Sequence, residues 1–271
     1  MGGWYQRGQF SAAQMNFHQE SKPDMNSGNV RSGCCGFPLT LSRYAKIFRV
    51  VEVQQTFYQP PLARTLERWR EQVSSEFEFT LKAWQLITHE ATSPTYRRLH
   101  EKLSEREKRE VGAFRLSAPV LRAWERTLEC ARILGSRVIL LQCPARFGPT
   151  QENKANLRSF LRKIRSDTRS KSEEERLTLV WEPRGEWKAE EVKELCEELG
   201  LVHGVDPFQQ MPVTAGGGYF RLHGRGGYRY RYSDAELEEL LAKTRAWSPC
   251  YVLFNNLSMR EDAQRFQALA A

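Results

Sequence analysis

The stretch Tyr219-Phe220-Arg221-Leu222-His223-Gly224-Arg225-Gly226-Gly227 decides how the chain can fold. As a β-strand it alternates, so that Arg221 and His223 share one face and the apolar residues between them share the other. Burying unpaired charge costs free energy, so a polar inward face indicates a site. The glycine-rich and arginine-rich turn leads to a predicted helix start at Ser233, a layout that suits an anion. A solvated basic turn is the alternative.

Seven further segments of the chain read as strands, and they alternate with amphipathic helical segments. With Tyr219–His223, the predicted strands are Val30–Cys34, Val50–Gln54, Phe77–Lys82, Val138–Gln142, Leu177–Glu182, Leu201–Val205 and Tyr251–Asn255. The predicted helices are Leu39–Phe48, Leu62–Gln72, Pro119–Leu134, Gln151–Arg165, Lys188–Leu199, a short one near Pro207–Met211, Asp234–Ala246 and Met259–Leu269. Eight such units predict an α/β protein with a single (β/α)8 TIM-type barrel over residues 30–271. A doubly wound open sheet is the alternative.

The N-terminal segment and the composition limit the classes of protein to which the chain can belong. Residues 1–29 lack periodicity and are rich in Gly, Gln, Ser and Asn, which predicts a disordered N-terminal extension. The extension has no secretory or transit pattern, and no apolar run approaches the ~20 residues of a membrane span. We therefore expect a cytoplasmic protein with no membrane partner. The net charge of +8 favours anionic partners.

The cysteines suggest neither a metal site nor a disulfide framework. They occur at positions 34, 35, 130, 143, 196 and 250, with no CxxC motif. Buried free thiols in a reducing compartment are the simplest interpretation. Cys34 and Cys35 lie at a strand end, where a thiol could meet a ligand.

Polar side chains gather at the C-terminal strand ends, where barrels of this class place their reacting groups. The candidate catalytic residues are Glu182, Lys82, His223 and Glu52. The candidate substrate-binding residues are Arg221, Arg225, Arg184, Asn255, Gln54, Tyr58, Trp84 and Asp206. Several chemistries stay open: a lysine base or Schiff-base amine, a Glu182 acid or base, and an anion clamp of Arg221, His223 and Arg225. The basic neighbours argue against a metal ion held by the acidic residues, and no pattern selects a cofactor.

The alternation of side chains along the predicted strand Phe77–Lys82 gives a specific expectation for Lys82. Thr80, Lys82 and Trp84 alternate with apolar residues, so we expect the ammonium group to point into the barrel mouth. We further expect it to form a hydrogen bond or ion pair with Glu52 or Glu182.

Six segments together resemble the YecE-like proteins, domain-of-unknown-function family 72. They are Gly33–Pro38, Val51–Tyr58, Phe79–His89, Trp181–Arg184, Tyr219–Arg225 and Tyr251–Asn256. The resemblance covers roughly residues 30 to 270 and implies a TIM-type barrel. It implies no activity, because the family has no established one. Relatives commonly have serine where this chain has Cys35, which argues against an essential hydroxyl there.

Three functions remain open at this point. The first is an enzyme, of hydrolase, lyase or isomerase type, that acts on an anionic, phosphate-bearing small molecule by general acid/base chemistry at the barrel mouth. The second is a nucleic-acid-binding or nucleic-acid-processing protein, in which Tyr228, Tyr230 and Tyr232 stack on bases between arginines. The third is a non-catalytic interaction scaffold.

Overall fold

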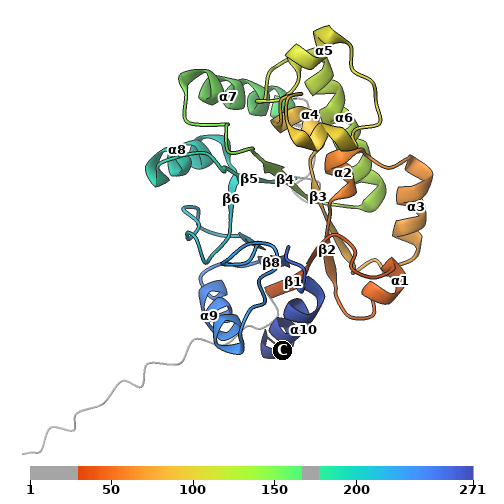
Figure 1. Cartoon of the computed structure of the whole chain (residues 1–271), viewed down its shortest axis with the longest axis vertical. Coiled ribbons are helices and arrows are strands. Elements are labelled where there is room, and N and C mark those ends of the chain that lie inside the picture. The colour runs from red at the N-terminus through yellow and green to blue at the C-terminus, as the bar shows by residue number, and fades with distance from the viewer. Residues whose placement is uncertain (1–29, 167–176, 271) are drawn as a thin grey trace, which may run out of the picture.

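The computed structural model describes residues 30–166 and 177–270, so the predicted disordered extension at residues 1–29 lies outside the described residues. In the described part, eight parallel strands close into a barrel in chain order, and β1 pairs with both β2 and β8 (Figure 1). The strands are β1 Val30–Cys35, β2 Val50–Val53, β3 Glu78–Lys82, β4 Val138–Gln142, β5 Thr178–Glu182, β6 Val202–Val205, β7 Gly218–Leu222 and β8 Cys250–Phe254. The predicted barrel is confirmed, and the open sheet is excluded.

Helices surround the barrel and connect its strands (Figure 1). They are α1 Leu41–Tyr44, α2 Gln55–Tyr58, α3 Ala63–Glu71, α4 Gln85–Thr88, η2 Pro94–Arg98, α5 Glu105–Glu110, α6 Ala118–Leu134, α7 Gln151–Ser166, α8 Ala189–Leu199, α9 Asp234–Thr244 and α10 Met259–Ala270. Local side chains and glycines set several helix boundaries. Ser233 and Glu236 form a capping box at the start of α9, and Gly135 and Gly200 adopt the left-handed conformation at the ends of α6 and α8.

One predicted helix is absent from the structure, and the connection after β3 holds two short helices, η2 and α5, in its charged stretch. Pro207–Met211 is a turn, because the Asp206 side chain accepts a hydrogen bond from Phe208 N and the following Pro212 disfavours helix at Met211. The charged stretch 96–109 divides into η2 and α5, because the Ser104 side chain and Glu107 form a capping box that starts a new helix. The connection between β3 and α6 lies beside the barrel, where η2 contacts α2 and α5 contacts α6.

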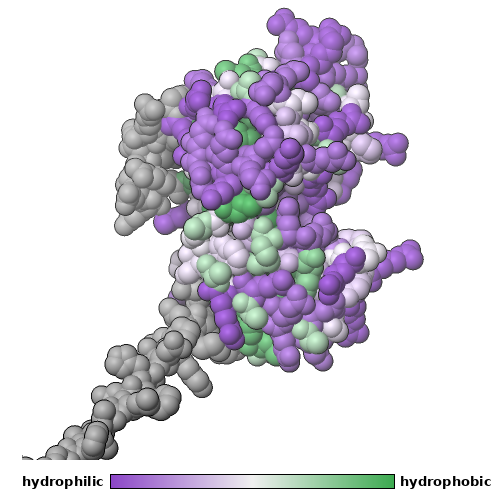
Figure 2. All heavy atoms as spheres, turned by 90° about the vertical axis from the view of Figure 1, so that its left-hand side faces the viewer, coloured by the Kyte–Doolittle hydropathy of each residue, from purple (hydrophilic) through white to green (hydrophobic). Residues whose placement is uncertain are grey.

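The side chains of the strands separate into two layers, as period two requires. Outward residues pack against the helices, whose other sides are polar. Figure 2 shows one such face, which is mainly hydrophilic with a band of apolar residues across its middle. The inward apolar residues form a second cluster of Cys35, Val50, Val138, Leu140, Val180, Tyr219, Tyr251 and Leu253. Above this cluster, toward the C-terminal strand ends, the inward residues become polar.

Two further sequence expectations can be compared with the described residues. No helix in the two described ranges has both the length and the apolar character needed to cross a bilayer. All six cysteines lie in these ranges as buried free thiols, as predicted.

The first two strands approach closely at Gly33, where the Tyr44 hydroxyl inserts between them. This hydroxyl accepts a hydrogen bond from Cys34 N and donates one to Val50 O, both at 2.8 Å. A Cβ atom on Gly33 would lie 2.1 Å from Val50 O and 2.9 Å from the Tyr44 hydroxyl oxygen. Only glycine therefore fits at this position.

We expect Gly33→Ala to reduce the free energy of unfolding by at least about 1–3 kcal/mol, because the added methyl group must displace backbone. Urea unfolding measures the effect. Gly148→Ala is the matched control, since a Cβ there meets no atom within 4 Å. Equal midpoints for the two variants would contradict the close approach.

Candidate active site

A buried arginine spans the upper part of the barrel interior. Arg221 of β7 is fully buried, and its Nε and Nη2 donate to the two oxygens of Glu52 on β2 at 2.9 and 2.7 Å. Its Nη1 donates to Glu182 Oε2 on β5 at 2.7 Å. The guanidinium group thus joins two carboxylates from strands on different sides of the barrel, one of them in a bidentate pair.

The two carboxylates have further hydrogen-bond donors. The Tyr219 hydroxyl donates to Glu52 Oε2 at 2.7 Å, the Gln54 amide donates to Oε1, and Gln142 Nε2 donates to Glu182 Oε1 at 2.8 Å. Burial alone would raise the pKa of each carboxyl, but Arg221 and Tyr219 outweigh it at Glu52, and Arg221, His223 and Arg184 outweigh it at Glu182, so both pKa values lie below the usual range. Glu52 and Glu182 are therefore ionised at neutral pH.

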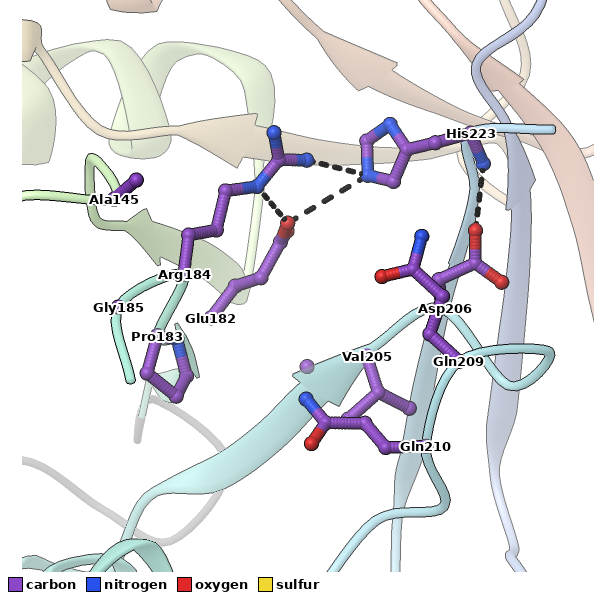
Figure 3. Close-up of a pocket in the computed structure, with 11 residues that line it drawn as sticks. Ala145, Glu182, Pro183, Arg184, Gly185, Val205, Asp206, Gln209, Gln210 and His223 are labelled. Carbon is purple, nitrogen blue, oxygen red and sulfur yellow. Dashed lines mark hydrogen bonds and ion pairs between the residues drawn. The ribbon is translucent and has the colours of Figure 1, made fainter. Parts of the chain in front are cut away.

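Arg184, His223 and Asn255 converge above this pair at the barrel mouth, and Figure 3 shows the first two. Arg184 Nε donates to Glu182 Oε1 at 2.8 Å, and Arg184 Nη2 lies 2.7 Å from His223 Nε2. The other ring nitrogen of His223, Nδ1, lies 3.0 Å from the Asn255 side-chain amide nitrogen. Asp206 accepts a hydrogen bond from His223 N at 3.0 Å, which fixes the end of β7.

These contacts determine the protonation state of His223. Burial lowers its pKa most; Glu182 Oε1, 3.5 Å from Nε2, raises it, and the positive charges of Arg221 and Arg184 lower it, so the net shift is downward and the ring is neutral at pH 7. A neutral imidazole has one N–H, and an arginine only donates, so Nε2 accepts and Nδ1 carries the proton. The Asn255 amide is therefore oriented with its oxygen toward Nδ1, so that His223 Nδ1 donates a hydrogen bond to this oxygen.

Lys82 points into the mouth, as strand parity predicted, but its expected ion pair is absent. Among the described residues no carboxylate lies within ion-pairing distance of its amine, and Nζ lies 3.8 Å from the centre of the Phe57 ring. The prediction fails because Arg221 occupies Glu52 and Glu182. Burial, with the positive charge of Arg221 added and the two carboxylates only partly opposing, lowers the pKa of Lys82 to about 7.

A cavity of about 480 Å³ opens beside Glu182, Arg184 and His223, and Lys82 is not among its lining residues. Its lining includes four predicted site residues, Glu182, Arg184, Asp206 and His223, together with Gln209 and Gln210 from the turn after β6 (Figure 3). The described residues contain no group of three or more His, Cys, Asp or Glu side chains arranged to hold a metal ion. The acidic oxygens at the mouth instead accept hydrogen bonds from arginines, tyrosine and amides.

Comparison with protein families matches residues 35–271 to the family described as Protein of unknown function DUF72. The chain belongs to this family. The resemblance stated from the six sequence segments is therefore confirmed.

Solved structures of DUF72 proteins share the fold. A DUF72 family protein from Enterococcus faecalis V583 is 23% identical, with a TM-score of 0.62 over 89% of this chain and 96% of that chain. A DUF72 family protein from Thermotoga maritima MSB8 is 22% identical, with a TM-score of 0.57 over 89% and 98%. D-psicose 3-epimerase is 14% identical, with a TM-score of 0.52 over 85% and 91%. No curated protein matches the chain in sequence.

Three predicted binding residues of this DUF72 barrel have other roles. Arg221 cannot clamp an anion, because its donors are engaged by Glu52 and Glu182. Arg225 turns toward α9, where it forms an ion pair with Glu236 at 3.1 Å. Trp84 is buried among the helices, because β3 ends at Lys82 and the strand alternation does not extend beyond it.

Two other predicted binding residues lie at the edge of the site. Gln54 acts through its hydrogen bond to Glu52. Tyr58 stacks under Arg98, whose guanidinium carbon lies 3.5 Å from the ring centre.

Sequence reasoning assigned no site role to two residues that the barrel brings to the mouth, Gln142 and Phe57. Gln142 is the last residue of β4, and its parity and position match those of Lys82 and Glu182. Phe57 lies under the Lys82 amine, and His89 packs edge-on against Phe57 with ring centres 4.9 Å apart. Burial, with the charges of Lys82 and Arg184, lowers the pKa of His89 to about 3. Strand parity alone would have identified Gln142.

We expect Arg221→Met to reduce the free energy of unfolding by about 3–5 kcal/mol, because two ionised carboxylates would stay buried without their partner. Urea unfolding at pH 7 measures this loss. Arg184→Met is the control, because Arg184 is partly exposed and its removal leaves Arg221 in place. An Arg221→Met protein that is as stable as this control would contradict the central role of the arginine.

The stability effect of Lys82 should depend on pH. Its pKa is about 7 in the folded protein and about 10.4 in an unfolded chain, so folding releases a proton between these values. Stability then rises with pH in this window, and the cost of burying Lys82 is largest at pH 7 and below. We expect Lys82→Met to be more stable than the parent by a few kcal/mol at pH 7, and the gain to shrink as the pH approaches 10. Urea unfolding at both pH values tests this, and a constant gain would contradict it.

Proposed function

We propose that the protein is an enzyme that binds a small anionic substrate in the barrel mouth and uses Lys82 in proton transfer. The observation that carries the proposal is the position of the Lys82 amine. It lies at the C-terminal end of a barrel strand, is 6% exposed, and has no carboxylate partner among the described residues. Active sites of this fold lie at this end of the strands. An amine that titrates near neutral pH is suited to accept and return a proton.

The other ionisable groups of the mouth are less suited to this task. Glu52 and Glu182 were candidate proton-transfer residues, but Arg221 holds both in the ionised form. Both ring nitrogens of His223 have hydrogen-bond partners, and its pKa is lowered. Lys82 therefore takes the proton-transfer role. Glu52 and Glu182 position Arg221, and their negative charges raise the pKa of Lys82 against the opposing effects of burial and Arg221.

The balance of charge favours an anion. Arg221 and Arg184 pair with the two buried glutamates, so a protonated Lys82 adds a positive charge without an ion-pair partner among the described residues. The third carboxylate, Asp206, accepts hydrogen bonds from backbone N–H groups. An anionic substrate supplies the missing counter-charge. Arg184 is the best-placed group to bind it, because its Nε and Nη2 are engaged while its Nη1 has no partner among the described residues (Figure 3). A phosphate or carboxylate group fits this donor.

The nucleic-acid alternative has less support. Of the three tyrosines that would stack on bases, Tyr232 is buried and the Tyr230 hydroxyl donates to Glu236 at 2.5 Å. Only Tyr228 of this set is widely exposed. A single aromatic side chain beside Arg229 and Arg231 is a weak stacking surface compared with the several that single-strand binding uses.

We expect Arg184→Gln to weaken the binding of inorganic phosphate about tenfold, the size of one lost charge-assisted hydrogen bond. Isothermal titration at low salt measures the change. Arg225→Gln is the matched control, because Arg225 pairs with Glu236 and does not line the cavity.

Two results would contradict the proposal. In the first, both variants bind phosphate as the parent does. In the second, the protein binds single-stranded oligonucleotides with a steep dependence on salt, and Arg229→Gln weakens this binding while Arg184→Gln does not.

A further inference from the structure

An amine that exchanges protons near neutral pH can also act as a nucleophile when its nitrogen is free of hydrogen bonds. No described residue makes a hydrogen bond or ion pair with Lys82 Nζ, which lies 3.8 Å from the centre of the Phe57 ring. The nitrogen lone pair is therefore free, as a nucleophile requires.

Three groups around Lys82 offset part of the cost of a cation on that nitrogen, although burial and Arg221 oppose a positive charge there. Phe57 presents its ring face to Nζ, and His89 packs against the Phe57 edge. The negative charges of Glu52 and Glu182 act on Lys82 from the barrel interior. An iminium nitrogen at this position would be stabilised by the ring face and by both charges.

We propose that Lys82 forms a covalent imine with the carbonyl carbon of a small anionic aldehyde or ketone, whose anionic group is bound by Arg184. This inference rests on the proposed function and narrows its substrate class to carbonyl compounds. The other lysines of the described residues are at least partly exposed, so the reaction should be selective for Lys82.

The chemical step balances without a further reactant. The neutral amine attacks the carbonyl carbon, a C–N bond forms, and the carbonyl π electrons move to the oxygen. The two hydrogens of the amine then leave with that oxygen as one water molecule, and the C=N bond replaces C=O. Protonation of the imine nitrogen gives an electron-withdrawing iminium group, which acidifies the neighbouring C–H bonds.

The pKa of Lys82 supports a fast reaction at neutral pH. With a pKa of about 7, half of its amine is neutral at pH 7. An exposed lysine with a pKa of about 10.4 is neutral to less than about one part in a thousand at that pH. Lys82 thus has roughly a thousandfold larger fraction of reactive amine.

The test uses pyridoxal 5′-phosphate, a small aldehyde with a phosphate group, and pyridoxal, which lacks the phosphate. The full chain is incubated with each aldehyde at pH 7 and treated with borohydride, whose hydride adds to the imine carbon and fixes the bond as a secondary amine. Peptide mass spectrometry then locates the adduct. Lys82→Met removes the nucleophile, and Lys46→Met, at an exposed lysine, is the matched control.

The expected result is an adduct at Lys82 in the parent and in Lys46→Met, at least tenfold more with pyridoxal 5′-phosphate than with pyridoxal. Inorganic phosphate should compete with it, and Arg184→Gln should reduce it. Labelling spread over exposed lysines, and unchanged in Lys82→Met, would overturn the inference. If phosphate binding depends on Arg184 but Lys82 gives no adduct, the imine is wrong and the proposed function stands. If phosphate does not bind and Lys82 gives no adduct, both are wrong.

Discussion

The barrel mouth depends on the pairing of Arg221 with Glu52 and Glu182. Placing three charges in a protein interior is favourable only when each is paired and hydrogen-bonded, and here Tyr219, Gln54 and Gln142 complete the set. The result is a hydrogen-bonded cluster of fixed geometry below the mouth. Two further groups of the site are held by this cluster: Arg184 donates to Glu182, and His223 lies within hydrogen-bond distance of Arg184.

The same pairing explains the unusual state of Lys82. Two carboxylates lie near enough to affect its pKa, yet neither accepts a hydrogen bond from it, because their oxygens face Arg221. A bidentate arginine is a stronger partner for a carboxylate than a lysine ammonium group. Competition between two cations for the same acids therefore leaves one of them, Lys82, without a partner and close to neutrality.

The sequence was sufficient for the barrel and for the side of each strand that faces inward, because both follow from local alternation and from the order of elements. It placed Lys82, Glu182, His223 and Asn255 at one mouth for the same reason. It did not reveal which acid pairs with which base, since Arg221 and Glu52 are 169 residues apart and their contact depends on closure of the barrel. Trp84 was misplaced because alternation holds only while the strand lasts, and β3 ends at Lys82.

Because the barrel closes between its first and last strands, it can be completed only after the last strand has been synthesised. β1 pairs with β8, and Arg31 donates to the Tyr251 hydroxyl from 220 residues away along the chain. During synthesis β1 has one open edge until β8 leaves the ribosome, and contacts at such separation form slowly. An exposed parallel edge is a template for pairing with other chains. The nascent protein should therefore depend on chaperones until its last strand is made, and any truncation before β8 should aggregate rather than leave a smaller folded protein.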